Sequence, residues 1–228
     1  MTRTLIAGDW HLGHYSTPLQ AALALGFLRR ARDAGHLVVL NGDIFEGLFE
    51  SAARAEQAHP AIGAVIAELA RDGRLLRTEG NHDPGAGARS HVIEHAAVGR
   101  VLVAHGHMVD PVHDSSVGQF GDGISRRFGH LALVRGAAAL AEAAVAGTVA
   151  APVDRLYRRR CLATVQRAGC VLGVFGHNHR RYLVPGHRYA NAGRMRRTRL
   201  EYLALDAAGA ALGEFTLDDM GEGARPAS

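Results

Sequence analysis

The stretch Gly80-Asn81-His82-Asp83 decides how the rest of this chain is interpreted. It follows an apolar run at 75–76 that is typical of a β-strand, so its polar side chains are expected at a strand end. Open α/β sheets bind their ligands at the carboxyl ends of strands. A tight turn would use the same residue types, because glycine and asparagine tolerate left-handed backbone. Taken alone, this stretch leaves a turn and a binding site open.

Four further polar clusters also follow strand-like apolar runs, at 5–7, 37–40, 101–103 and 171–175. They are Asp9 with His11, Asp43, His105, and His177 with His179. Turns alone do not readily explain five such clusters. Two carboxylates, an amide and several imidazoles suit Mn, Fe, Zn or similar divalent ions. Alternate residues of an extended chain point the same way, so Asp9 and His11 can serve one centre, as can His177 and His179.

The order of the expected elements indicates the fold class. Helices are expected at 18–32 and from Pro60, between the apolar strands, and closing antiparallel strands at 189–191, 200–205 and 211–217. This alternation predicts a layered α/β core. Between 111 and 169 the pattern is helical, with a basic helix at 154–167, which predicts an inserted cap. The expected domains are a core of 1–110 and 171–217, a helical cap of 111–170 and a flexible tail of 218–228.

Composition places the chain among ordinary globular proteins. It has 228 residues, 47% of them apolar and 21% charged, which is enough for one α/β domain with a cap. All 26 basic residues are arginine, and the net charge of +4 suits an anionic substrate. Cys161 and Cys170 show no zinc or redox spacing. With no signal-peptide pattern and no apolar run of about 18 residues, a cytoplasmic protein is expected.

The five clusters resemble the motifs of the calcineurin-like metallophosphoesterase superfamily. The matching stretches are Gly-Asp-Trp-His at 8–11, Gly-Asp at 42–43, Gly-Asn-His-Asp at 80–83, His-Gly-His at 105–107 and Gly-His-Asn-His at 176–179. The resemblance implies a four-layer αββα sandwich that holds two divalent metal ions about 3.5–4 Å apart. Manganese is expected, with iron, zinc or magnesium as alternatives.

The resemblance also implies roles for individual residues. One metal would take Asp9, His11, Asp43 and His179. The other would take Asp43, Asn81, His105 and His177. His82 matches the catalytic histidine, which lies close to the metals and stabilises charge or protonates the leaving oxygen during phosphoester hydrolysis. Asp83 is expected to hold either His82 or the turn.

The 72-residue interval between His105 and His177 resembles the capped bacterial UDP-2,3-diacylglucosamine pyrophosphatase of lipid A synthesis. That family usually has an arginine where His82 stands and an aspartate where His107 stands, which leaves another substrate open. Arginine grips phosphate bidentately. The expected substrate-binding residues are Asn81, Arg155, Arg158 and Arg159.

Three functions remain open. The first is hydrolysis of a nucleotide-sugar lipid pyrophosphate, with the amphipathic cap touching the surface of the inner membrane from the cytoplasm. The second is a general phosphodiesterase or phosphomonoesterase acting on small soluble or nucleotide substrates. The third is a non-catalytic scaffold, against which the intact motifs argue. Nucleic acid is not an expected partner, because aromatics are only 6% and offer no stacking platform. The sequence carries no signal for an oligomeric state.

Overall fold

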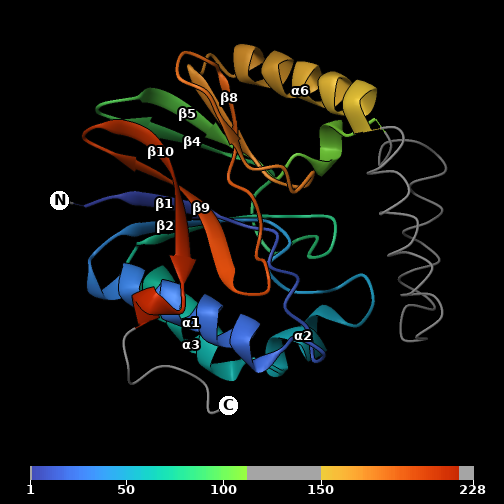
Figure 1. The fold of residues 1–228 in the computed structure, drawn as a ribbon, viewed down its shortest axis with the longest axis vertical. Coiled ribbons are helices and arrows are strands. Elements are labelled where there is room, and N and C mark those ends of the chain that lie inside the picture. Colours follow the sequence, from blue (N-terminus) through green and yellow to red (C-terminus); the bar gives the residue numbers. More distant parts are fainter. Residues whose placement is uncertain (1, 112–149, 221–228) are drawn as a thin grey trace.

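The computed structural model describes residues 2–111 and 150–220 (Figure 1). Most of the expected cap, at 112–149, lies outside the described residues, as does the tail from 221. Within them, the chain builds two mixed five-stranded sheets, one with the order β10-β9-β1-β2-β3 and the other β4-β5-β6-β8-β7.

The helices and 3-10 helices are α1 (Pro18–Asp33), α2 (Ala52–Gln57), α3 (Pro60–Arg71), η1 (His107–Val109), α6 (Ala150–Arg167) and η2 (Asp218–Met220). The first sheet contains β1 (Thr4–Ala7), β2 (Leu37–Asn41), β3 (Leu75–Thr78), β9 (Arg199–Asp206) and β10 (Gly209–Thr216). The second contains β4 (His91–His95), β5 (Gly99–Val103), β6 (Leu172–Phe175), β7 (Tyr182–Leu183) and β8 (Tyr189–Asn191).

Alternating side chains along the buried strands divide the core into layers. In β1, Leu5 packs into the cluster that includes α1 and α3, whereas Ile6 packs between the two sheets. In β5, Val103 also lies between the sheets, whereas Leu102 faces α6. This is the period of two that a strand imposes on its side chains. The result is helices, sheet, sheet and helix in that order, as Figure 1 shows, and the expected αββα sandwich is the architecture observed.

Local sequence explains where the helices begin. At the start of α1, the Thr17 hydroxyl accepts the backbone N–H of Gln20, and the Gln20 side chain accepts the N–H of Thr17. This reciprocal cap, followed by Pro18 in the first turn, satisfies donors that a helix start leaves open. Pro60 starts α3 in the same position.

Four features differ from the sequence-based expectation. Strand β8 pairs antiparallel with β7 as expected but parallel with β6, whereas β9 and β10 are antiparallel as expected. Strands β4 and β7 were not expected. Residues 150–167, assigned to the cap, form helix α6, whose Tyr157, Cys161 and Val165 are buried against the second sheet. Residues 218–220 form η2, where Arg30 donates to the Asp219 carbonyl at 2.8 Å.

Candidate metal centre

The five polar clusters meet at one edge of the sandwich. Strands β1, β2 and β3 run parallel in one sheet, and β5 and β6 run parallel in the other. Each cluster follows the carboxyl end of one of these strands. Ligand atoms within 4.8 Å of one another occur in three overlapping groups: Asp9, His11 and His179; Asp43, His105 and His177; and His11, Asp43 and His82. The predicted ligands therefore converge, drawn from both sheets.

The backbone at these positions is unusual. Among the described residues, five that are not glycine have a positive φ: Asp9 at 54°, His11 at 49°, Asp43 at 53°, His177 at 66° and His179 at 58°. All five are predicted ligands. Left-handed backbone is costly for residues with a Cβ and persists where the surroundings enforce it, often at functional sites. The chain thus turns sharply to aim these side chains inward.

Glycines permit the close approach of neighbouring loops. A Cβ on Gly80 would lie 2.5 Å from the backbone nitrogen of Asp43 and would collide with its carboxylate. A Cβ on Gly42, which has φ of 75°, would lie 2.6 Å from the ring of His105. Without side chains at these two positions, the loop after β3 and the His105 ring can both close on Asp43.

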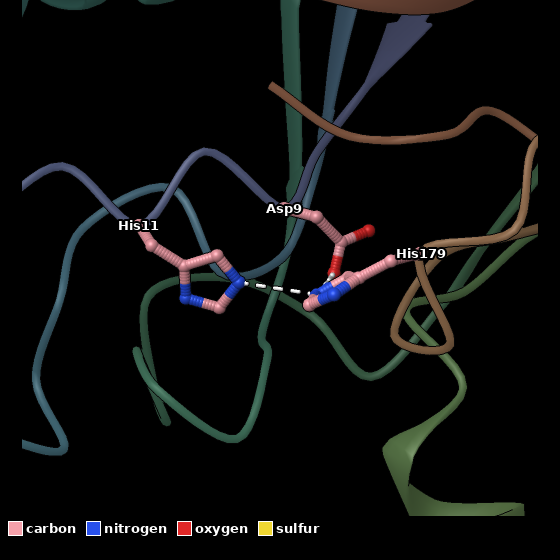
Figure 2. A group of neighbouring side chains, drawn as sticks. All are labelled: Asp9, His11 and His179. Atoms are coloured by element: carbon pink, nitrogen blue, oxygen red, sulfur yellow. Dashed lines mark hydrogen bonds and ion pairs between the residues drawn. The ribbon is translucent and has the colours of Figure 1, made fainter. Parts of the chain in front are cut away.

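The first group has the spacing of a coordination shell. Figure 2 shows Asp9, His11 and His179 pointing toward one another. Nε2 of His179 lies 3.3 Å from Oδ1 of Asp9 and 3.3 Å from Nε2 of His11. Ligand atoms about 2.1 Å from one cation lie roughly 3.0–3.4 Å apart in octahedral or tetrahedral geometry. These three atoms therefore fit a single ion.

The second group fits in the same way. Nε2 of His105 lies 3.2 Å from Oδ2 of Asp43 and 3.3 Å from Oδ1 of Asn81, and Nδ1 of His177 lies 3.1 Å from that amide oxygen. Oδ2 of Asp43 is also 3.9 Å from Nε2 of His11. One carboxylate oxygen thus faces both groups, which suits a ligand shared by two cations.

Two of the imidazoles have an outer nitrogen held by an acceptor. Nδ1 of His105 lies 2.9 Å from the Asn41 carbonyl, and Nε2 of His177 lies 2.7 Å from Oδ2 of Asp110. Metal-binding histidines commonly donate their second N–H in this way, which fixes the tautomer and ring orientation. Sequence reasoning missed Asp110; its place five residues after His105 is the only signal.

His82 is held by a buried glutamate that sequence reasoning also missed. Nδ1 of His82 lies 2.7 Å from Oε1 of Glu46, which also accepts the backbone N–H groups of Leu48 and Phe49. Oε2 of Glu46 lies 3.6 Å from Nδ1 of His11. With Nδ1 of His82 occupied, Nε2 remains for proton transfer.

Asp83 orders the loops. Its Oδ1 accepts the backbone N–H groups of Asp43 and Gly80 at 2.8 and 2.9 Å, and its Oδ2 accepts that of Ile44 at 2.9 Å. The bonds from Asp43 and Ile44 tie the loop after β3 to the loop after β2, and the bond from Gly80 closes the turn itself. Of the two expectations for Asp83, these contacts support the one in which it holds the turn.

Burial and charge oppose each other at the centre. Burial alone would raise the pKa of Asp9 and of Asp43, but His105 beside them lowers both below the usual value. Burial alone would lower the pKa of His11, but the bond to Glu46 raises it to about 9. For His105, burial is likewise outweighed by Asp43, and its pKa is about 10. The carboxylates therefore hold positive charge here, as protons or as metal ions.

The predicted arginines of α6 have other neighbours. The Arg158 guanidinium lies 4.1 Å from the centroid of the Tyr182 ring and 3.0 Å from Oδ2 of Asp154. Arg155 and Arg159 lie on the exposed side of the helix. Asp154 also accepts the side-chain N–H of Asn178 at 3.0 Å, which links Arg158 to the loop that carries His177 and His179. The role of Arg155, Arg158 and Arg159 in substrate binding stays a prediction.

No protein-family model matches the sequence, and no curated protein matches it. Several solved structures are similar. A conserved uncharacterized protein from Streptococcus pneumoniae TIGR4, described as a predicted phosphoesterase, has a TM-score of 0.47 and 14% identity over 95% of this chain and 90% of its own. A dimetal phosphatase from Danio rerio has a TM-score of 0.48 and 13% identity over 94% and 98%. Wild-type Vps29 complexed with zinc, from Entamoeba histolytica, has a TM-score of 0.44 and 14% identity over 94% and 99%.

Likeness of this degree carries no argument about activity, so the class of protein rests on the geometry above. The fold and the site define an α/β sandwich whose sheet ends gather carboxylates and imidazoles fitted to two divalent cations. Within the ranges that the structure describes, no helix has the length and apolarity needed to cross a bilayer.

Proposed function

We propose that this protein is a metal-dependent phosphoesterase that hydrolyses phosphomonoesters or phosphodiesters of small soluble or nucleotide substrates. The observation that carries the proposal is the convergence of seven predicted ligands into two groups that share Asp43. Two bound cations would supply an activated water and neutralise charge on the phosphate oxygens. The donor set of oxygen and imidazole nitrogen suits manganese, iron or zinc.

His82 supplies the proton in this proposal. As the phosphorus–oxygen bond breaks, the leaving oxygen takes a proton from Nε2 of His82. The Glu46 carboxylate, 2.7 Å from Nδ1, keeps the ring oriented. Asn81 and the half-buried His11 and His179 lie at the accessible side of the centre, where a substrate phosphate would approach.

A lipid-linked pyrophosphate substrate remains a prediction of the sequence. Its support was the resemblance of the interval between His105 and His177 to a capped pyrophosphatase, and most of that expected cap, at 112–149, lies outside the described residues. No contact of the described residues favours an acyl chain over a small soluble ester, so the simpler substrate class is proposed here. Manganese as the working metal and a peripheral place at a membrane surface remain predictions in the same sense.

A manganese-supplemented assay tests the proposal. Bis-p-nitrophenyl phosphate, p-nitrophenyl phosphate and UDP-diacylglucosamine are offered in parallel to the wild-type protein and to Asp43→Ala. Turnover of either nitrophenyl ester, absent from the variant, supports the proposed function. Turnover of UDP-diacylglucosamine alone would instead support a lipid-linked pyrophosphate as the substrate. Two bound metals with no turnover of any substrate would favour a non-catalytic scaffold.

A further inference from the structure

The turn between β8 and β9, at 192–198, contacts the loop that carries the predicted ligand Asp9. The backbone N–H of Met195 donates to the Asp9 carbonyl at 3.2 Å, and the N–H of Arg194 donates to Oε2 of Glu201 at 3.1 Å. Gly193, with φ of 87°, packs against the buried Glu201 side chain. The turn is therefore anchored on one side to the loop that carries Asp9 and on the other to the first sheet.

The arginines of this turn and Arg199, the first residue of β9, differ in what their guanidinium groups contact. Arg196 and Arg199 both pair with Oε1 of Glu201, at 2.6 and 3.4 Å. The Arg194 guanidinium instead places Nη1 3.3 Å from Nδ1 of His179. Across the described parts of the chain, no carboxylate forms an ion pair with it. Its charge is thus directed at the metal centre and is not neutralised there.

His179 is the exception among the four predicted ligand imidazoles. The outer nitrogens of His105, His177 and His11 face a carbonyl or carboxylate oxygen, as described above. The outer nitrogen of His179 faces a guanidinium, which has only donors. Nε2 of His179 points to Asp9 and His11, so when it binds a cation the ring keeps its proton on Nδ1. Two donors then face each other across 3.3 Å and need a shared acceptor.

We propose that Arg194 binds a non-bridging oxygen of the substrate phosphate, beside the Asp9, His11 and His179 group. The inference rests on the proposed function, and it assigns phosphate binding to a residue that the sequence did not indicate. An anionic oxygen would accept from the guanidinium and from Nδ1 of His179 together. Arginine suits this role because its planar fork matches phosphate geometry and its charge does not depend on pH near neutrality.

The test is a calorimetric titration of inorganic phosphate into manganese-loaded protein, with metal content measured in each sample. The variants are Arg194→Gln and Arg194→Lys. The matched control is Arg197→Gln, which removes the same charge from an exposed position on the same turn. Arg194→Gln should weaken phosphate binding by about 10- to 100-fold, the usual effect of losing a hydrogen bond to a charged group. Arg194→Lys should recover part of this loss, and Arg197→Gln should stay within about twofold of wild type.

Several results would overturn the inference. Wild-type phosphate affinity in Arg194→Gln at full metal content would do so directly. Equal losses in Arg194→Gln and Arg197→Gln would indicate a general effect of net charge. Loss of manganese from both Arg194 variants would make the residue a support for His179 instead. The titration needs no turnover, so a wild-type protein that binds phosphate through Arg194 without hydrolysing esters would refute the proposed function but would still show that Arg194 binds phosphate.

Discussion

Glu46→Gln measures how much the buried carboxylate contributes through His82. Oε1 of Glu46 lies 2.7 Å from Nδ1 of His82 and accepts two backbone N–H groups. Glutamine keeps an acceptor oxygen of the same shape and removes the charge. A hydrogen bond to a charged group contributes about 1.5–3 kcal/mol and a neutral one about 1 kcal/mol. The difference of about 0.5–2 kcal/mol predicts that kcat falls roughly 2- to 30-fold.

The assay is a double-mutant cycle on bis-p-nitrophenyl phosphate with manganese-loaded protein. His82→Ala should lower kcat by about 10²–10⁴, the usual contribution of general acid–base catalysis. Glu46→Gln combined with His82→Ala should be no slower than His82→Ala alone, because Glu46 then has no ring to orient. Metal content should be unchanged in all four proteins.

A matched control comes from a second glutamate–histidine pair. Glu50, whose side chain is 3% exposed like that of Glu46, lies 2.7 Å from Nδ1 of His14. Glu50→Gln removes an equally buried charge from a pair outside the predicted centre and should leave kcat unchanged. Because Oε2 of Glu46 also lies 3.6 Å from His11, the rival explanation is an effect on the metals. Lost metal in Glu46→Gln, or a double mutant that multiplies both losses, would refute the reasoning.

Three further predictions concern the centre itself. Asp43→Ala removes the shared ligand and should empty the centre; two metal equivalents per chain after loading, measured by mass spectrometry, would contradict the sharing. Because the pKa of His11 is raised to about 9 and that of His105 to about 10, both hold protons at pH 7 in metal-free protein. Metal affinity should therefore rise with pH up to about pH 9–10. Calorimetry in buffers of different ionisation enthalpy should detect the protons released when metal binds. An affinity that does not change with pH would contradict the protonation of these two histidines. Gly80→Ala should cost about 1–3 kcal/mol by overpacking against Asp43 and lower Tm by roughly 2–12 °C. Gly63→Ala, where the new methyl meets nothing closer than 3.9 Å, should not lower Tm.

The layered core could be read from the sequence because its strands are short apolar runs. In β2, four of five residues are fully buried, and Asp43 follows two residues after the strand ends. Strand β4 was not predicted because it lacks an apolar run. It is an edge strand in which half-buried and exposed residues alternate, and it begins and ends in histidine. The parallel pairing of β8 with β6 was missed because a three-residue strand carries no signal for its partner. Its pairing depends on the route that the chain takes through β7.

The predicted ligands could be found because each follows an apolar run in a short recognisable cluster. Their supporting residues could not be found in this way. Glu46 is separated from His82 by 36 positions, and Asp110 from His177 by 67. A single carboxylate in a loop is the commonest kind of surface residue, and only the folded arrangement shows that these two are bound to imidazoles. Arg194 could not be singled out among 26 arginines, because only the folded arrangement shows its contact with His179.

The pairing of β1 has a consequence for folding during synthesis. One edge of β1 is covered by β9, where Thr4 lies opposite Leu205, so β1 is synthesised long before the strand that pairs with it on that side. Until then its backbone donors and acceptors on that side remain open to pairing with another nascent chain. Expression at low temperature or with a trigger-factor-type chaperone should therefore raise the soluble yield more than any stabilising change at the metal centre.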